Sequence, residues 1–151
     1  MSNTTANAYL RNRILTASAE ELRLMLYDGA IKFCHQALDA IREKQIEPGY
    51  NALMRAQKIL LELSTSLKHD SDPDLCSKLS ALYTYIYRLL VDANMQRQPE
   101  PVEEALRLLE YERQTWLMLM EQIDATPPGQ TSPQAVTGAQ QTAISSLSLN
   151  G

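Results

Sequence analysis

Apolar residues recur at helical spacing along most of the chain. Ser18 and Glu21 fit a capping box, in which the serine hydroxyl accepts from the third amide of a helix and the glutamate reaches back to the cap. We therefore expect a helix to begin at Ser18. On a wheel advancing about 100° per residue, its broad apolar face consists of Leu22, Met25, Leu26, Gly29, Phe33, Ala37, Ala40 and Ile41.

A second apolar stripe lies beside this face on the same predicted helix. It consists of Leu24, Tyr27, Ile31, Cys34 and Leu38. The polar positions that remain form only a narrow strip. A helix with so much apolar surface is either central in a bundle or supplies a surface to another chain.

Three further amphipathic helices are expected after the first. The Glu-Pro-Gly segment 47–49 breaks the pattern, so the second helix is predicted from about residue 50 to 67. Asp72 caps the third, with Pro73 in its first turn. We expect that helix to end at the RQPEP segment 97–101, because proline removes a donor and disfavours helical geometry in the preceding residue.

The last helix is predicted over residues 102–124. The inward positions of the last three helices are Leu53, Ala56, Leu60, Leu63, Leu67, Leu75, Leu79, Leu82, Ile86, Leu89, Ala93, Val102, Ala105, Leu106, Leu109, Trp116, Leu117, Met120 and Ile123. No alternating strand pattern competes with these assignments. Four amphipathic helices with short connections predict an all-α protein, an antiparallel up-down four-helix bundle over residues 17–124.

The two ends of the chain differ from this central region. Residues 1–16 form a polar arm that carries Tyr9, Leu10 and Ile14. Residues 125–151 contain no charged or aromatic side chain and three of the seven prolines, so they cannot bury enough apolar surface to offset their ordering entropy. We expect a disordered C-terminal tail, although its ISSLSL run could dock weakly on another surface.

Composition and charge exclude several classes of protein. Of the 151 residues, 44% are hydrophobic, which is enough for one sizeable core. The 14 basic residues are scattered and are outnumbered by 18 acidic ones, which disfavours nucleic-acid binding because phosphate neutralisation needs clustered cations. No signal peptide and no apolar run of about 20 residues is present, so we expect a cytoplasmic protein without membrane insertion.

Motifs for catalysis or cofactor binding are missing from the sequence. Neither histidine belongs to the Glu-x-x-His pair of a di-iron bundle, and there is no Gly-rich phosphate loop, CxxC or HExxH motif. We therefore expect no enzyme activity, no metal and no cofactor. One alternative is a histidine phosphotransfer domain with His35 on the polar strip of the first helix. The residues after His35 lack the lysine and glycine expected there.

The sequence contains more apolar surface than one core needs. A structural or regulatory homo-oligomer, such as a homodimer, would bury this surface between copies. A groove for an amphipathic helix of another protein is the second explanation. Both alternatives stay open on the sequence pattern alone.

Residues 9–38 resemble the flagellin export chaperones of the FliS family. The likeness rests on an arm with Tyr9, the Thr-Ala-Ser segment 16–18 before Glu21-Leu22, and the Met-Leu-Tyr-Asp-Gly-Ala signature 25–30. It continues through residues 55–67, the tyrosine-rich run 79–94 and Trp116. Ala19 departs from the family, which commonly has proline there, and the tail after Asp124 is longer than usual.

The resemblance implies a cytoplasmic type III export chaperone. Such a protein would bind the disordered C-terminal segment of flagellin, prevent premature polymerisation and deliver the subunit to a component of the flagellar export gate. It also implies a lid formed by Tyr9, Leu10 and Ile14, which gives way when flagellin binds. We expect the flagellin-binding residues to be Leu24, Tyr27, Ile31, Leu38, Tyr83 and Tyr87.

Overall fold

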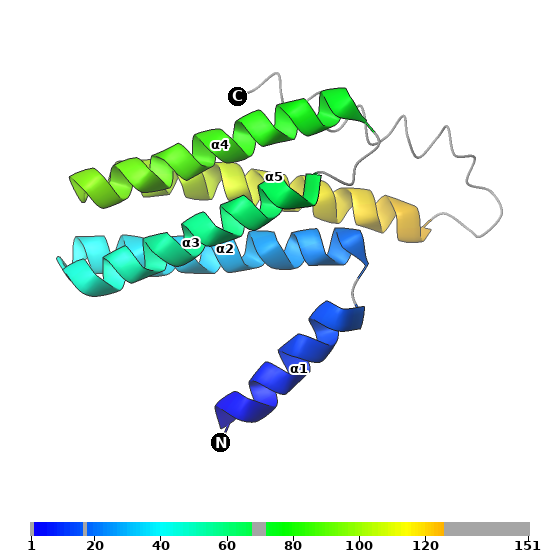
Figure 1. Cartoon of the computed structure of the whole chain (residues 1–151), viewed down its shortest axis with the longest axis horizontal. Coiled ribbons are helices and arrows are strands. Elements are labelled where there is room, and N and C mark those ends of the chain that lie inside the picture. The colour runs from blue at the N-terminus through cyan, green and yellow to red at the C-terminus, as the bar shows by residue number, and fades with distance from the viewer. Residues whose placement is uncertain (1, 17, 68–71, 126–151) are drawn as a thin grey trace.

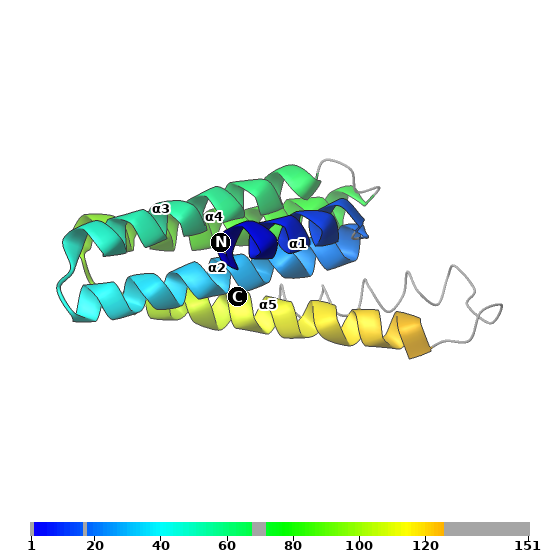
Figure 2. The ribbon, with the colours of Figure 1, turned by 90° about the horizontal axis from the view of Figure 1, so that it is seen from below.

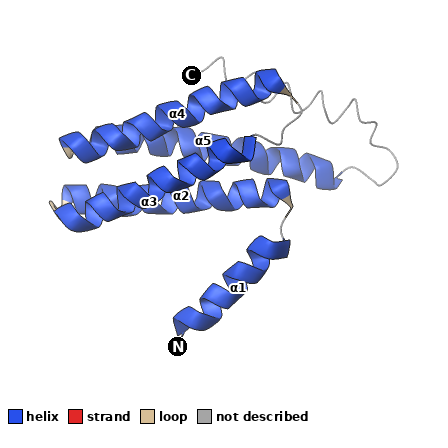
Figure 3. Ribbon diagram, viewed as in Figure 1, coloured by secondary structure: helices blue, strands red, loops and turns tan. Residues whose placement is uncertain are grey.

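The computed structural model describes residues 2–16, 18–67 and 72–125, and the regular structure in these ranges is helical throughout (Figures 1 and 3). Five helices run in the order α1 (Ser2–Thr16), α2 (Ala19–Arg42), α3 (Ile46–Ser66), α4 (Pro73–Gln96) and α5 (Pro99–Ala125). The expectation of a disordered tail falls on residues that lie, apart from Ala125, outside the described ranges.

Helices α2 to α5 form the bundle. Each packs along two neighbours, α2 against α3 and α5, and α4 against α3 and α5 (Figures 1 and 2). Short connections reverse the direction of the chain at each step, which gives the antiparallel up-down arrangement. The inward residues of all four helices merge into one hydrophobic core. The predicted all-α bundle is therefore confirmed.

The predicted helix caps are present. The Ser18 hydroxyl accepts a hydrogen bond from the Glu21 amide at 3.2 Å. The Asp72 carboxylate accepts from the amides of Asp74 and Leu75 at 3.1 and 3.3 Å, with Pro73 in the first turn. These bonds satisfy amides that have no partner within the helix, and each cap is worth about 1 kcal/mol.

The predicted starts of the second and fourth bundle helices were wrong. Helix α3 begins at Ile46 rather than near residue 50, and α5 begins at Pro99 rather than Val102. In both cases the prolines lie within the first turn, where the missing amide has no intrahelical acceptor to lose. Pro48 therefore lies in the first turn of α3 rather than in the break before it.

The assignment of the core face of α2 was wrong in part. Tyr27, Cys34 and Leu38 of the second stripe are buried, whereas Leu26 and Phe33 of the supposed main face are only partly buried. Because α2 packs against α3 on one side and α5 on the other, both stripes meet a neighbour. Helix α2 is therefore apolar around most of its circumference because it packs against two neighbouring helices.

Residues 2–16 are helical, which the sequence pattern did not predict because their apolar residues do not line one face. Helix α1 turns back from the start of α2 and diverges from the bundle (Figures 1 and 2). No helix in the described ranges is long and apolar enough to cross a membrane.

Candidate functional site

An apolar pocket of about 860 Å³ opens at the end of the bundle where α2 and α4 finish and α3 begins. We call it the end pocket. Its apolar lining includes Ile41, Ile46, Tyr50, Met54, Val91 and Met95. This volume lies within the range of ligand-binding clefts in proteins.

The rim of the end pocket exposes large apolar side chains. Ile46 is 60% exposed, Tyr50 50% and Met95 78%. Lys44, Glu47 and Arg97 lie beside them and keep their charges in water. A cluster of exposed apolar residues rimmed by charges is typical of a surface that binds another polypeptide.

Two residues in the left-handed region shape this end of the bundle. Lys44 has φ 57° and Arg97 has φ 54°, both unusual for residues with a side chain. They end α2 and α4, where the Gln45 amide donates to Ala40 O at 2.8 Å and the Arg97 amide donates to Ala93 O at 2.8 Å. The same turns allow α3 and α5 to begin within three residues, so the pocket is built on short, hydrogen-bonded corners.

Sequence reasoning missed the end pocket. Residues 47–49 were interpreted as a break between helices, and the apolar side chains of Ile46 and Tyr50 beside it were not assigned to a surface. The available signal was the pair Met54 and Met95, since methionine is frequent at adaptable binding surfaces. The space itself depends on how α3 and α4 pack in the bundle, which a local sequence pattern does not predict.

The six residues expected to bind flagellin lie in two environments. Tyr27, Leu38 and Tyr83 belong to the core and are buried, so in this structure they offer no surface to a partner. Leu24, Ile31 and Tyr87 are partly buried and pack against the core from its edge. None of the six lines the end pocket.

The residues expected to form the lid lie on α1. Tyr9 is 65% exposed and Leu10 is 48% exposed, so neither covers the bundle in this structure. The side chain of Ile14 lies outside the described side chains. Helix α1 has 15 residues and is about 22 Å long, whereas α2, with 24 residues, is about 36 Å long. Folded back from the start of α2, α1 would reach the level of Leu24 and Ile31 but not the end pocket.

A polar cluster is buried in the core between α2, α4 and α5. The hydroxyl oxygens of Tyr27 and Tyr83 are 2.5 Å apart, and Glu112 is only 2% exposed. Burial raises the pKa of Glu112 to about 7, although a hydrogen bond from Tyr27 and the charge of Arg23 oppose the shift. Burial also raises the pKa of Tyr27 well above its usual value, so its hydroxyl keeps its proton.

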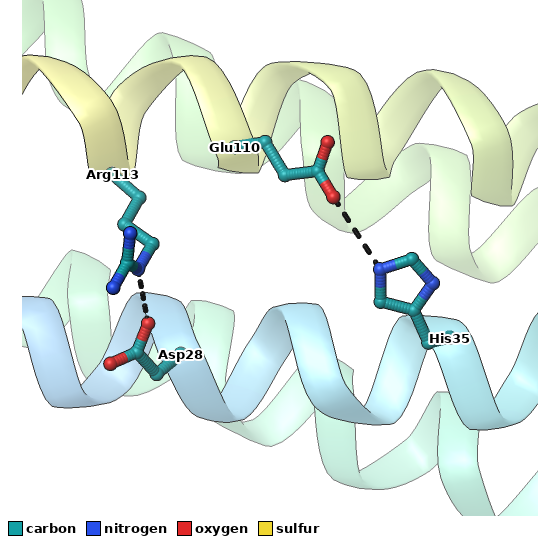
Figure 4. A network of polar contacts seen from close by, with 4 residues as sticks. All are labelled: Asp28, His35, Glu110 and Arg113. Carbon is teal, nitrogen blue, oxygen red and sulfur yellow. Dashed lines mark hydrogen bonds and ion pairs between the residues drawn. The ribbon is translucent and has the colours of Figure 1, made fainter.

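Ion pairs connect α2 to α5 along their exposed seam. Arg113 donates to Asp28, and His35 Nε2 lies 3.4 Å from Glu110 Oε1 (Figure 4). Arg42 donates to Glu103 at 3.0 Å further along. Exposed pairs of this kind contribute about 0–1 kcal/mol each.

The side-chain chemistry of the described residues offers little for catalysis. No group of three His, Cys, Asp or Glu side chains among them could hold a metal ion. Burial raises the pKa of the Cys34 thiol to about 12, which leaves it uncharged and a poor nucleophile. The feature best suited to a function is therefore the apolar surface around the end pocket.

Comparison with known proteins agrees with the resemblance in the sequence. A family model described as Flagellar protein FliS matches residues 1–123. The flagellar secretion chaperone FliS of Bacillus subtilis is 35% identical over 109 residues, which is 72% of this chain and 80% of the relative. That of Campylobacter jejuni is 30% identical over 115 residues, 76% of this chain and 90% of the relative. The match spans α1 and nearly all of the bundle, and the chain belongs to the FliS family.

Proposed function

We propose that this protein is a cytosolic export chaperone for flagellin. It binds the disordered C-terminal segment of the newly made subunit, prevents premature polymerisation and delivers the subunit to a component of the flagellar export gate. The observation that carries the proposal is the end pocket with its exposed apolar rim, in a member of a family whose relatives are named flagellar secretion chaperones.

The pocket suits an amphipathic segment of a client chain. Burial of apolar surface lowers the free energy of the complex by roughly 25 cal/mol per Å². An amphipathic helix in a groove presents apolar residues at every third or fourth position. Met54 and Met95 adapt to different side chains because methionine is unbranched and flexible. Ordering the client offsets part of the gain, which permits release at the export machinery without nucleotide hydrolysis.

A second contact zone lies on the partly buried residues Leu24 and Ile31 of α2, whereas Tyr87 lies on α4, which packs against α3 and α5. Together with the end pocket, this zone would hold a client along the length of the bundle rather than at one point. Tyr27, Leu38 and Tyr83 would support it from within the core. Substitution Ile31→Asp should weaken the complex while the helical signal in circular dichroism persists. Loss of that signal would show that Ile31 is needed for the core instead.

Helix α1 diverges from the bundle in this structure (Figure 1); as the lid of this second zone, it would fold back onto α2 when flagellin is absent. Its length matches the half of α2 that carries Leu24 and Ile31, and its exposed Tyr9 and Leu10 provide apolar contacts. Removal of residues 1–15 should increase the binding of an environment-sensitive dye and change flagellin affinity. If both quantities stay the same as in the full chain, α1 is not a lid.

Calorimetric titration with a peptide of about the last 40 residues of flagellin tests the proposed function. We expect a one-to-one complex with a large negative heat-capacity change, because apolar surface is buried and the client becomes ordered. A peptide of the same composition in scrambled order is the control. Absence of binding at micromolar concentration, with a solution mass twice that of the chain, would favour the homodimer alternative.

A further inference from the structure

The end pocket and the C-terminal segment of the chain have matching chemistry. Beyond Ala125, the large apolar side chains are Val136 and a cluster of three within six residues: Ile144, Leu147 and Leu149. No charged side chain lies anywhere in residues 126–151. An uncharged segment can enter an apolar pocket without the desolvation of a charge, while Lys44 and Arg97 on the rim stay in water.

The tail is long enough to reach the pocket. The pocket lies where α4 ends and α5 begins, since Arg97 lines it, and α5 runs 27 residues away from it, about 40 Å. The roughly 19 residues between Ala125 and Ile144 span about 60 Å when extended at 3.3 Å per residue. The segment can therefore return along the whole of α5 with chain to spare.

We propose that residues 144–149 dock in the end pocket when no other polypeptide fills it. The other candidate within this chain is α1. It joins the bundle at the start of α2, the end opposite the pocket, and it is too short to reach the pocket. The side chains of Ile144, Leu147 and Leu149 contact Tyr50, Met54 and Met95, and they cover apolar surface that is otherwise exposed.

This docking is weak and reversible. A flexible chain of about 19 residues has a root-mean-square span of about 25 Å, which is shorter than the distance along α5, so the tethered segment is present at an effective concentration on the order of a millimolar or below. A client that binds with micromolar affinity displaces it. This regulatory consequence rests on the proposed function, whereas the docking itself does not.

Methyl NMR of the full-length protein tests the docking without any client. The chain labelled at its methionine methyl groups reports on the pocket through Met54 and Met95 and on a distant exposed site through Met118. Two full-length variants with equal charge are compared: Leu147→Asp with Leu149→Asp inside the docking segment, and the control Thr131→Asp with Ser132→Asp, which adds the same charge to the tail outside that segment. None of the substituted positions belongs to the core of the described residues 2–16, 18–67 and 72–125.

In the leucine variant, we expect the Met54 and Met95 resonances to shift while Met118 keeps its position. In the Thr131→Asp, Ser132→Asp control, all three should stay as in the unmodified chain. Identical Met54 and Met95 spectra in the two variants would overturn the proposal, as would shifts that depend on protein concentration, because the pocket would then be filled by a second copy. Failure of the flagellin titration leaves this comparison unaffected, so the two proposals fail separately.

Discussion

The hydroxyl groups of Tyr27 on α2 and Tyr83 on α4 meet across the bundle, with their oxygens 2.5 Å apart in a fully buried position. Their rings lie 6.3 Å apart between centroids and are tilted by 59°. Glu112 of α5 accepts a hydrogen bond from Tyr27, so three helices share one polar cluster. A buried cluster of this kind requires the three helices to pack in one register.

Substitution Tyr27→Phe should destabilise the protein by about 1–3 kcal/mol, because it removes a partner of two buried polar groups. Urea unfolding followed by circular dichroism measures the change. Tyr85→Phe is the matched control: Tyr85 is exposed and donates to Glu104 at 2.6 Å, and the expected loss of stability is much smaller than for Tyr27→Phe. Equal losses for the two variants would show that the buried hydroxyl pair stabilises the protein no more than an exposed hydrogen bond does.

The buried Glu112 should make stability depend on pH. Its pKa rises from 4.5 to about 7 on folding, so between these values the folded state holds a proton that the unfolded state has released. The contribution of Glu112 to the free energy of unfolding therefore decreases as the pH rises through this window, by at most about 3 kcal/mol. Glu112→Gln should abolish this slope and stabilise the protein at pH 8.

Thermal or urea unfolding from pH 4.5 to 8 provides the comparison. The control is Glu110→Gln, since the side chain of Glu110 is exposed on the surface of α5, 3.4 Å from His35 Nε2. Its pH profile should keep the slope of the unmodified protein. A Glu112→Gln profile parallel to that of the unmodified protein would contradict a buried acid with a raised pKa.

Helices α2 and α3 approach closely at Gly29. A β-carbon at this position would lie 3.1 Å from Ile59 Cδ1, which is tighter than most contacts. Gly29→Val should therefore push the helices apart and cost about 1–3 kcal/mol. Gly49→Ala is the control, because its β-carbon would meet Ala40 at an ordinary 3.5 Å and alanine favours a helix.

Unfolding in urea distinguishes these two variants. A neutral Gly29→Val would show that Ile59 moves aside freely and that the glycine is not needed for the approach. The double variant Gly29→Val with Ile59→Val, which removes the clashing methyl group, should recover part of the loss. This recovery tests whether Gly29 is needed for the close approach of α2 and α3.

Local signals in the sequence predicted the elements of the fold well. The caps at Ser18 and Asp72 depend on a side chain and amides two or three residues away, so the sequence contains all that is needed. The inward leucines of α3 form one stripe, and all of them are buried as expected. The starts of α3 and α5 were predicted wrongly because a proline such as Pro48 or Pro99 marks a helix start as readily as a helix end.

The arrangement of the site depends on contacts between distant residues. Tyr27 and Tyr83 were assigned to a surface because each lies beside the main stripe of its helix, yet the partner helices cover both. The end pocket depends on the positive φ of Lys44 and Arg97. The sequence gives no sign of this geometry, because neither position holds the glycine or asparagine that usually adopts a positive φ at a helix end. Only the assembled bundle shows which apolar residues remain exposed.

The most direct test of the account is the affinity of Met95→Glu for the flagellin C-terminal peptide, measured by calorimetry against Met118→Glu. Both methionines are exposed, so neither change disturbs the core, but only Met95 lines the end pocket. We expect Met95→Glu to weaken binding about tenfold or more, because a carboxylate would be buried against the client, and Met118→Glu to leave it within about twofold. Equal affinities for the two variants would contradict the end pocket as the flagellin site.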